Sequence, residues 1–81
     1  MSINLAAIKE GTSIIPNEDS KEYDFSSDIL LTREVDKYFD DDESVGFRIV
    51  RGDVYELGPS GNDYGEGDII YMGVEDIKEV L

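Results

Sequence analysis

The chain has 81 residues, 40% of them hydrophobic, which suits one small folded domain spanning residues 1–81 and excludes a second one. It carries 20 acidic residues against 7 basic ones, a net charge of -13, which argues against direct binding to DNA or RNA because carboxylates and phosphates repel each other. Cysteine and histidine are absent, which excludes disulfides, thiolate metal sites and catalysis by a histidine base.

The membrane and secretion signals that a sequence can carry are missing. No apolar run approaches the length of about 18 residues that crosses a membrane. The first residues, MSINLAAIKEG, lack the basic start and the longer apolar core of a signal peptide. We therefore expect a soluble, cytoplasmic protein without membrane contact.

The first third of the chain predicts short elements. Ser2 can cap a helix over residues 3–10 that ends before Gly11, although a run this short is equally compatible with a strand. An extended segment follows at residues 12–15. Residues 21–26 have the alternation of a short strand, with two aromatic residues on one side, Tyr23 and Phe25.

The next segment predicts the main helix, over about residues 28–39. Ser27 can serve as its N-cap, and Asp28 lies in the first turn, where the helix dipole favours a carboxylate. Apolar residues then recur at helical spacing and should pack on a sheet: Leu31, Val35, Tyr38 and Phe39, with Leu30 beside them. In an alternative interpretation, residues 28–32 form a strand and the helix begins at Thr32.

The second half predicts a sheet. Two β-rich runs at 46–57 are interpreted as a central hairpin whose turn is Arg51-Gly52, so the Arg51-Gly52-Asp53 tripeptide is read as a turn and not as an adhesion signal. A third strand is expected at 68–72, beyond a mobile glycine-rich loop at 58–67. A short helix of about two turns should end the chain.

These elements predict an α+β fold in which a small antiparallel sheet, the hairpin at about 46–57 plus the strand at 68–72, is packed by the amphipathic helix at about 28–39. A short C-terminal helix completes it. The competing architecture is a small, partly open β-barrel. A homodimer remains open.

The acidic residues are the candidate binding residues, because a rigid surface of carboxylates can occupy a basic cleft in place of nucleic acid. The densest cluster lies where the predicted helix meets the hairpin: Asp36, Asp40, Asp41, Asp42 and Glu43. Its last four members, Asp40, Asp41, Asp42 and Glu43, should project as a ridge whose neutralisation leaves stability unchanged or higher. A second set lies on the hairpin and the glycine-rich loop: Asp53, Glu56, Asp63, Glu66 and Asp68. The competing interpretation is a solvated face or an adaptation to high salt.

Calcium binding is an alternative that the same residues raise. An EF-hand loop requires glutamate at its twelfth position. A loop that begins at Asp40 places Arg51 there, and one that begins at Asn62 places Gly73 there, so only an irregular site stays open.

The sequence therefore predicts an acidic inhibitor rather than an enzyme, and no cofactor. Its expected partner is a basic nucleic-acid-binding protein or nuclease, whose DNA site it occupies as a DNA mimic, in the manner of phage or mobile-element inhibitors of host defence. An immunity or antitoxin protein that covers a basic toxin site is the alternative within the binding proteins.

Overall fold

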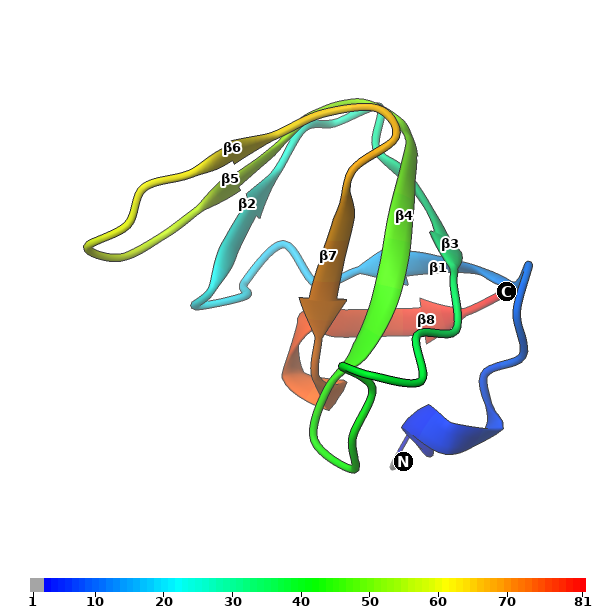
Figure 1. The fold of residues 1–81 in the computed structure, drawn as a ribbon. Helices are drawn as coiled ribbons and strands as arrows, with labels where there is room; N and C mark the ends of the chain where they lie inside the picture. Colours follow the sequence, from blue (N-terminus) through cyan, green and yellow to red (C-terminus); the bar gives the residue numbers. More distant parts are fainter. Residues whose placement is uncertain (1–2) are drawn as a thin grey trace.

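The structure, a computed structural model, describes residues 3–81 and consists of two antiparallel sheets (Figure 1). The five-stranded sheet has the order β7 (Ile69–Met72), β4 (Val45–Arg51), β3 (Leu30–Arg33), β1 (Ser13–Pro16) and β8 (Ile77–Val80). The three-stranded sheet has the order β2 (Tyr23–Phe25), β5 (Val54–Glu56) and β6 (Asp63–Tyr64). Two short 3-10 helices, η1 (Leu5–Ala7) and η2 (Val74–Asp76), complete the elements.

The two sheets share three long stretches of chain. In the larger sheet β4 pairs with β3 and β7, and in the smaller sheet β5, which continues from β4, pairs with β2 and β6. Residues 23–33, 45–56 and 63–72 thus form one antiparallel meander that is bent in the middle. Figure 1 shows the chain curving over between β4 and β5 and between β6 and β7.

The bend depends on Gly52, which the sequence placed in a hairpin turn. Its φ of 95° lies in the left-handed region, and a Cβ there would meet Ser26 Oγ at 2.6 Å. Ser26 bridges the bend, because its N–H donates to the Asp53 carbonyl and its Oγ accepts from the Asp53 N–H. The predicted hairpin at 46–57 is therefore wrong, since β4 and β5 pair with other strands and not with each other.

The hydrophobic core lies on the inner sides of the two sheets. β4 supplies Val45, Phe47 and Ile49 to the core and turns Arg48 and Val50 outward, as the alternation of a strand requires. The rest of the core comes from the other strands and from the segment around η1: Leu5, Ile8, Ile14, Tyr23, Leu31, Val54, Ile70, Met72 and Ile77.

The predicted helix at 28–39 is wrong, and with it the α+β class. Residues 3–81 contain no α-helix, and no helix packs on either sheet. Leu31 is 0% exposed because it lies on β3, whereas Val35 and Tyr38 are 46% and 93% exposed on the loop that follows, residues 34–44. The residues recur at helical spacing, but the hydrogen bonds of the β3–β4 ladder and the burial of every second residue stabilise the strand instead.

Neither end of the described chain forms the α-helix that the sequence predicted. The predicted C-terminal helix is wrong, since η2 is followed by β8, which pairs with β1. Only η1 replaces the predicted first helix, with Asn4 as its N-cap, and the proposed cap Ser2 lies outside the described residues. The extended segments at 12–15, 21–26 and 68–72 are confirmed as β1, β2 and β7.

Three further expectations concern the barrel, the glycine-rich loop and the membrane. The all-β composition is what a partly open barrel needs, but the structure has two open sheets, and the edge strands β7 and β8 are not neighbours. The glycine-rich loop at 58–67 is not wholly irregular, because it contains β6. In the described part of the chain, no helix is long and apolar enough to cross a membrane.

The exposure of Leu31 and Val35 gives a direct test of the strand. We expect Leu31→Ala to lower the free energy of unfolding by about 2–5 kcal/mol, because it leaves a cavity in the core. Val35→Ala should change it by less than about 0.5 kcal/mol. Urea unfolding followed by circular dichroism measures both free energies. Equal losses in the two variants would mean that both side chains are buried, as the predicted helix requires.

Candidate functional site

The outward side of the three-stranded sheet carries a row of three residues. Asp24 on β2 lies opposite Tyr55 on β5, and Tyr55 lies opposite Asp63 on β6. Residues directly opposite in antiparallel strands point to the same side, and all three are exposed. Their chain neighbours Tyr23 and Val54 point the other way, into the core.

The neighbouring rows extend this surface. The Leu57 N–H donates to the Glu22 carbonyl, which continues the pairing of β2 and β5 by one residue. On the other side, Asp53 lies opposite Ser26. We call the whole surface the acidic sheet face, and it consists of four carboxylates around two exposed apolar side chains: Glu22, Asp24, Asp53 and Asp63, with Tyr55 and Leu57.

No ion pair among residues 3–81 involves a carboxylate of the acidic sheet face. Strands β2, β5 and β6 contain no Lys or Arg. Among residues 3–81 the ion pairs are Arg33–Asp40 and Arg48–Glu34, both on other parts of the molecule. The carboxylates of the face are therefore left to solvent or to a partner.

Burial and nearby negative charges raise the pKa values of two residues at the start of β2. Burial raises the pKa of Glu22 above its ordinary value, and repulsion by Asp76, Glu75 and Glu56 raises it further. Burial, together with the charges of Glu22 and Glu56, raises the pKa of Tyr23 to about 12. The Tyr23 hydroxyl therefore stays protonated and donates to the Tyr71 carbonyl at 2.9 Å, which holds β2 against β7.

The structure divides the second set of predicted residues. Asp53 and Asp63 lie on the acidic sheet face, whereas Glu56 points to the opposite side and accepts from Asn62 Nδ2 at 3.3 Å. Asp68 accepts from the Gly65 N–H at 2.9 Å and closes the bend between β6 and β7, next to the exposed Glu66. Glu22 and Asp24 were missed, although the alternation of Tyr23 and Phe25 already placed them on the other side of β2.

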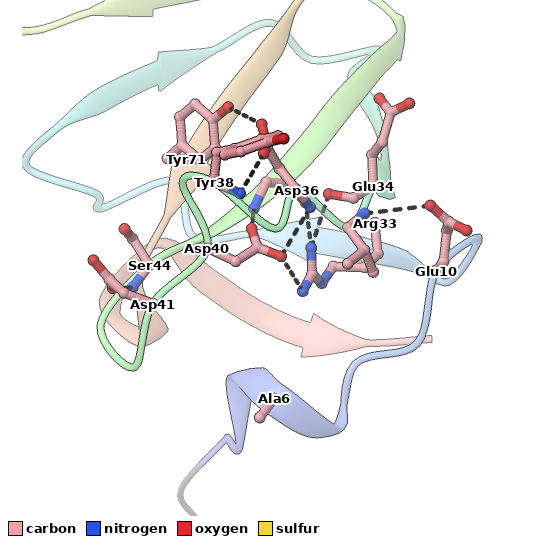
Figure 2. A network of polar contacts seen from close by, with 12 residues as sticks. Ala6, Glu10, Arg33, Glu34, Asp36, Tyr38, Asp40, Asp41, Ser44 and Tyr71 are labelled. Carbon is pink, nitrogen blue, oxygen red and sulfur yellow. Dashed lines mark hydrogen bonds and ion pairs between the residues drawn. The ribbon is translucent and has the colours of Figure 1, made fainter.

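The first set of predicted residues lies in loop 34–44, where the structure uses several of the carboxylates internally (Figure 2). Asp40 accepts from Arg33 Nη2 at 2.9 Å, from the Asp36 N–H at 3.0 Å and from the Gly46 N–H at 2.9 Å. Arg33 is only 5% exposed and also donates to the carbonyls of Glu34 and Gly46. Asp40 is thus the centre of a network that closes the loop.

The remaining members of that set behave differently from one another. Asp36 accepts from the Tyr71 hydroxyl and from the Tyr38 N–H, each at 2.9 Å. Asp41 accepts from two N–H groups of the turn that follows it, those of Glu43 and Ser44. Asp42 and Glu43 are exposed at the tip. The ridge expected at a helix C-terminus does not exist, because these residues form a turn, for which Asp is well suited.

The charge state of Asp40 follows from its partners. Burial alone would raise the pKa of Asp40, but hydrogen bonds from Arg33, Asp36 and Gly46 and the positive charge of Arg33 lower it below its ordinary value. The carboxylate is therefore ionised and holds the buried guanidinium.

Metal binding finds no support in the geometry. Within residues 3–81, no group of three or more acidic side chains is placed to hold a metal ion. Asp40, Asp41 and Asp68, which the calcium interpretation needs, each accept hydrogen bonds from the protein.

A separate apolar groove lies between η1 and β8. Its volume is about 810 Å³, and its walls include Ile8, Val74, Ile77 and Val80. The charged residues along it are Lys9 and Lys78 against Glu75 and Glu79, so it differs in character from the acidic sheet face.

Comparison with protein-family models, with curated proteins and with solved structures found no match to this chain.

The role of Asp40 is testable by urea unfolding. We expect Asp40→Asn to lower the free energy of unfolding by about 2–3 kcal/mol at neutral pH, because it removes the charged partner of a buried arginine. Asp42→Asn, at the exposed tip, should change it by less than about 0.5 kcal/mol.

The same pair of variants gives a pH dependence. The pKa of Asp40 is lower in the folded than in the unfolded protein, so its contribution is full above the unfolded value of about 4 and is lost as the pH falls through the folded value. The stability difference between wild type and Asp40→Asn should therefore shrink below about pH 4. A difference that grows on acidification would contradict this assignment.

Proposed function

We propose that this protein is an acidic inhibitor that occupies the nucleic-acid-binding site of a basic partner protein and presents the acidic sheet face in place of nucleic acid. The observation that carries the proposal is the four-carboxylate face around Tyr55 and Leu57, built on and beside three strands that contain no basic residue.

The layout of the face suits a site that binds nucleic acid. Neighbouring strands lie about 4.8 Å apart, so Asp24 and Asp63, on the outer two of three strands, are separated by about 10 Å with an aromatic ring between them. Sites for single-stranded nucleic acid combine a basic groove with aromatic side chains on which bases stack. On the acidic sheet face, the carboxylates can meet the basic groove and the ring can meet the stacking side chains.

The energetic argument concerns the net charge. A charge of -13 on 81 residues destabilises the compact state through self-repulsion, and among residues 3–81 the carboxylates of the face form no ion pair that would offset it. Binding to a basic cleft relieves this repulsion. A protein adapted only to high salt would instead unfold when salt is removed and would bind no basic protein.

The test is competition for defined basic proteins. Labelled duplex is bound to a bacterial histone-like protein or to a basic nonspecific nuclease, and its release on addition of this protein is followed by fluorescence anisotropy. We expect the triple variant Asp24→Asn, Asp53→Asn, Asp63→Asn to compete about tenfold less well, with a shallower salt dependence, because it removes charges that meet the partner.

A matched control separates the face from net charge. Glu10→Gln, Asp19→Asn, Glu79→Gln removes the same number of exposed carboxylates elsewhere and should compete within about threefold of wild type, as expected when distant charges are screened. If the two triple variants lose competition equally, net charge and not the acidic sheet face accounts for the binding. Release of the nuclease but not of the histone-like protein would favour the immunity or antitoxin alternative.

A second prediction concerns nucleic acid itself. At low salt the purified protein should not shift the mobility of duplex DNA or of RNA, because its carboxylates repel phosphate. A shifted band would refute mimicry outright.

A further inference from the structure

A second surface lies on loop 34–44, at the end of β4 opposite to the bend that leads to the acidic sheet face (Figure 1). Three large apolar side chains are exposed there within five residues: Val35 at 46%, Tyr38 at 93% and Phe39 at 65%. Exposed apolar groups gathered on one short loop, rather than scattered singly, are typical of an interaction site.

The loop fixes the backbone at Tyr38 and the ring of Phe39 before any partner arrives. The Tyr38 N–H donates to Asp36 Oδ1, and Asp36 Oδ2 accepts from the Tyr71 hydroxyl (Figure 2). The Phe39 ring packs against Tyr71 with their centroids 5.7 Å apart. A preorganised aromatic side chain loses little entropy on binding, which is the property of residues that dominate interface energies.

The charges beside the rings define what they can bind. Asp41, Asp42 and Glu43 come shortly after Tyr38 and Phe39 in the chain and are exposed, with Lys37 as the one basic residue of the loop. An apolar partner surface would strip water from these carboxylates without replacing its hydrogen bonds. A second copy of this chain, or an anionic lipid surface, would bring like charges together.

We propose that residues 35–43 form a docking point for an arginine side chain of a basic protein. A guanidinium group stacks on an aromatic face and at the same time donates two parallel hydrogen bonds to a carboxylate. Lysine carries the same charge but lacks the planar group that does both. Tyr38 supplies the ring, and the carboxylates of Asp42 and Glu43 supply the acceptors.

This inference deepens the proposed function, because it names the side-chain chemistry of the partner, but it rests on different residues. The competition assay depends on Asp24, Asp53 and Asp63, so failure at loop 34–44 leaves that assay unaffected. Conversely, if the competition assay shows no role for the acidic sheet face, an arginine preference at loop 34–44 can still be measured.

The test uses two peptides as probes, tri-arginine and tri-lysine, with blocked ends and equal charge. Each is titrated at low salt into the full chain, and the backbone amide and aromatic ring signals are followed by NMR. We expect tri-arginine to bind about two- to fivefold more tightly, the size of an exposed cation–π contact, with the largest shifts at Tyr38 and Phe39.

Variants locate the preference. Tyr38→Leu should bind the two peptides equally, whereas Tyr38→Phe should keep the arginine preference, because it keeps the ring. Val74→Ala, at an exposed apolar side chain outside both surfaces, is the control and should also keep it. Tyr55→Leu tests the acidic sheet face, where a second ring lies beside carboxylates, and should keep the preference as well. The Tyr38 side chain is 93% exposed, so these variants should fold, as a cooperative melt will verify.

Three results would overturn the proposal. One is equal binding of the two peptides by wild type, and another is an arginine preference that survives Tyr38→Leu. The third is loss of the preference in Tyr55→Leu, which would move the arginine contact to the acidic sheet face.

Discussion

The ion pair between Arg33 and Asp40 is the interaction on which the arrangement of β3, β4 and the loop between them depends. Arg33 ends β3 with its guanidinium almost fully buried, and a buried charge is tolerated only when it is paired. Asp40 supplies the partner and also accepts the Gly46 N–H, so the same carboxylate closes the loop and fixes the start of β4. Gly46 permits this close approach, because a Cβ there would meet the Glu34 carbonyl at 2.8 Å.

The fold sorts its many carboxylates into two groups. One group satisfies backbone N–H groups: Asp36, Asp40 and Asp41 in loop 34–44, Asp68 at the bend, and the buried Asp76, which accepts from the Gly73 N–H and the Ser20 hydroxyl. The other group has no such role and lies at the surface, most densely on the acidic sheet face. Acidity in this chain is therefore partly structural, and net charge alone overstates what is available to a partner.

The parts of the fold that follow from local pattern could be predicted from the sequence, and the parts that depend on distant pairing could not. β1, β2 and β7 show their alternation within a few residues. Residues 30–39 satisfy both periods, because Leu31 is the inward residue of a strand and also fits a helical stripe with Val35 and Tyr38. The choice is made by β4, which pairs with β3 from fourteen or more residues away.

The candidate site shows the same limit. Asp53 and Asp63 were identified by charge, but their place beside Asp24 and Glu22 results from the pairing of β5 with both β2 and β6. Asp40 was identified as a surface residue because four successive acidic residues suggest a solvated run. Its actual role needs Arg33, whose position inside the protein is a consequence of the strand that the helical pattern concealed.

The bent meander sets the distance between the two surfaces. β4 has seven residues, so at about 3.3 Å per residue it separates loop 34–44 from the bend by about 20 Å. That is the length of about six base pairs at 3.4 Å each, close to the whole width of a molecule that measures 28 × 25 × 24 Å. In the proposed complex, simultaneous contact with loop 34–44 and with the bend therefore requires a partner site of at least this length. Val45, Phe47 and Ile49 keep the separation fixed, so the preorganisation that a mimic needs comes from the residues that form the core.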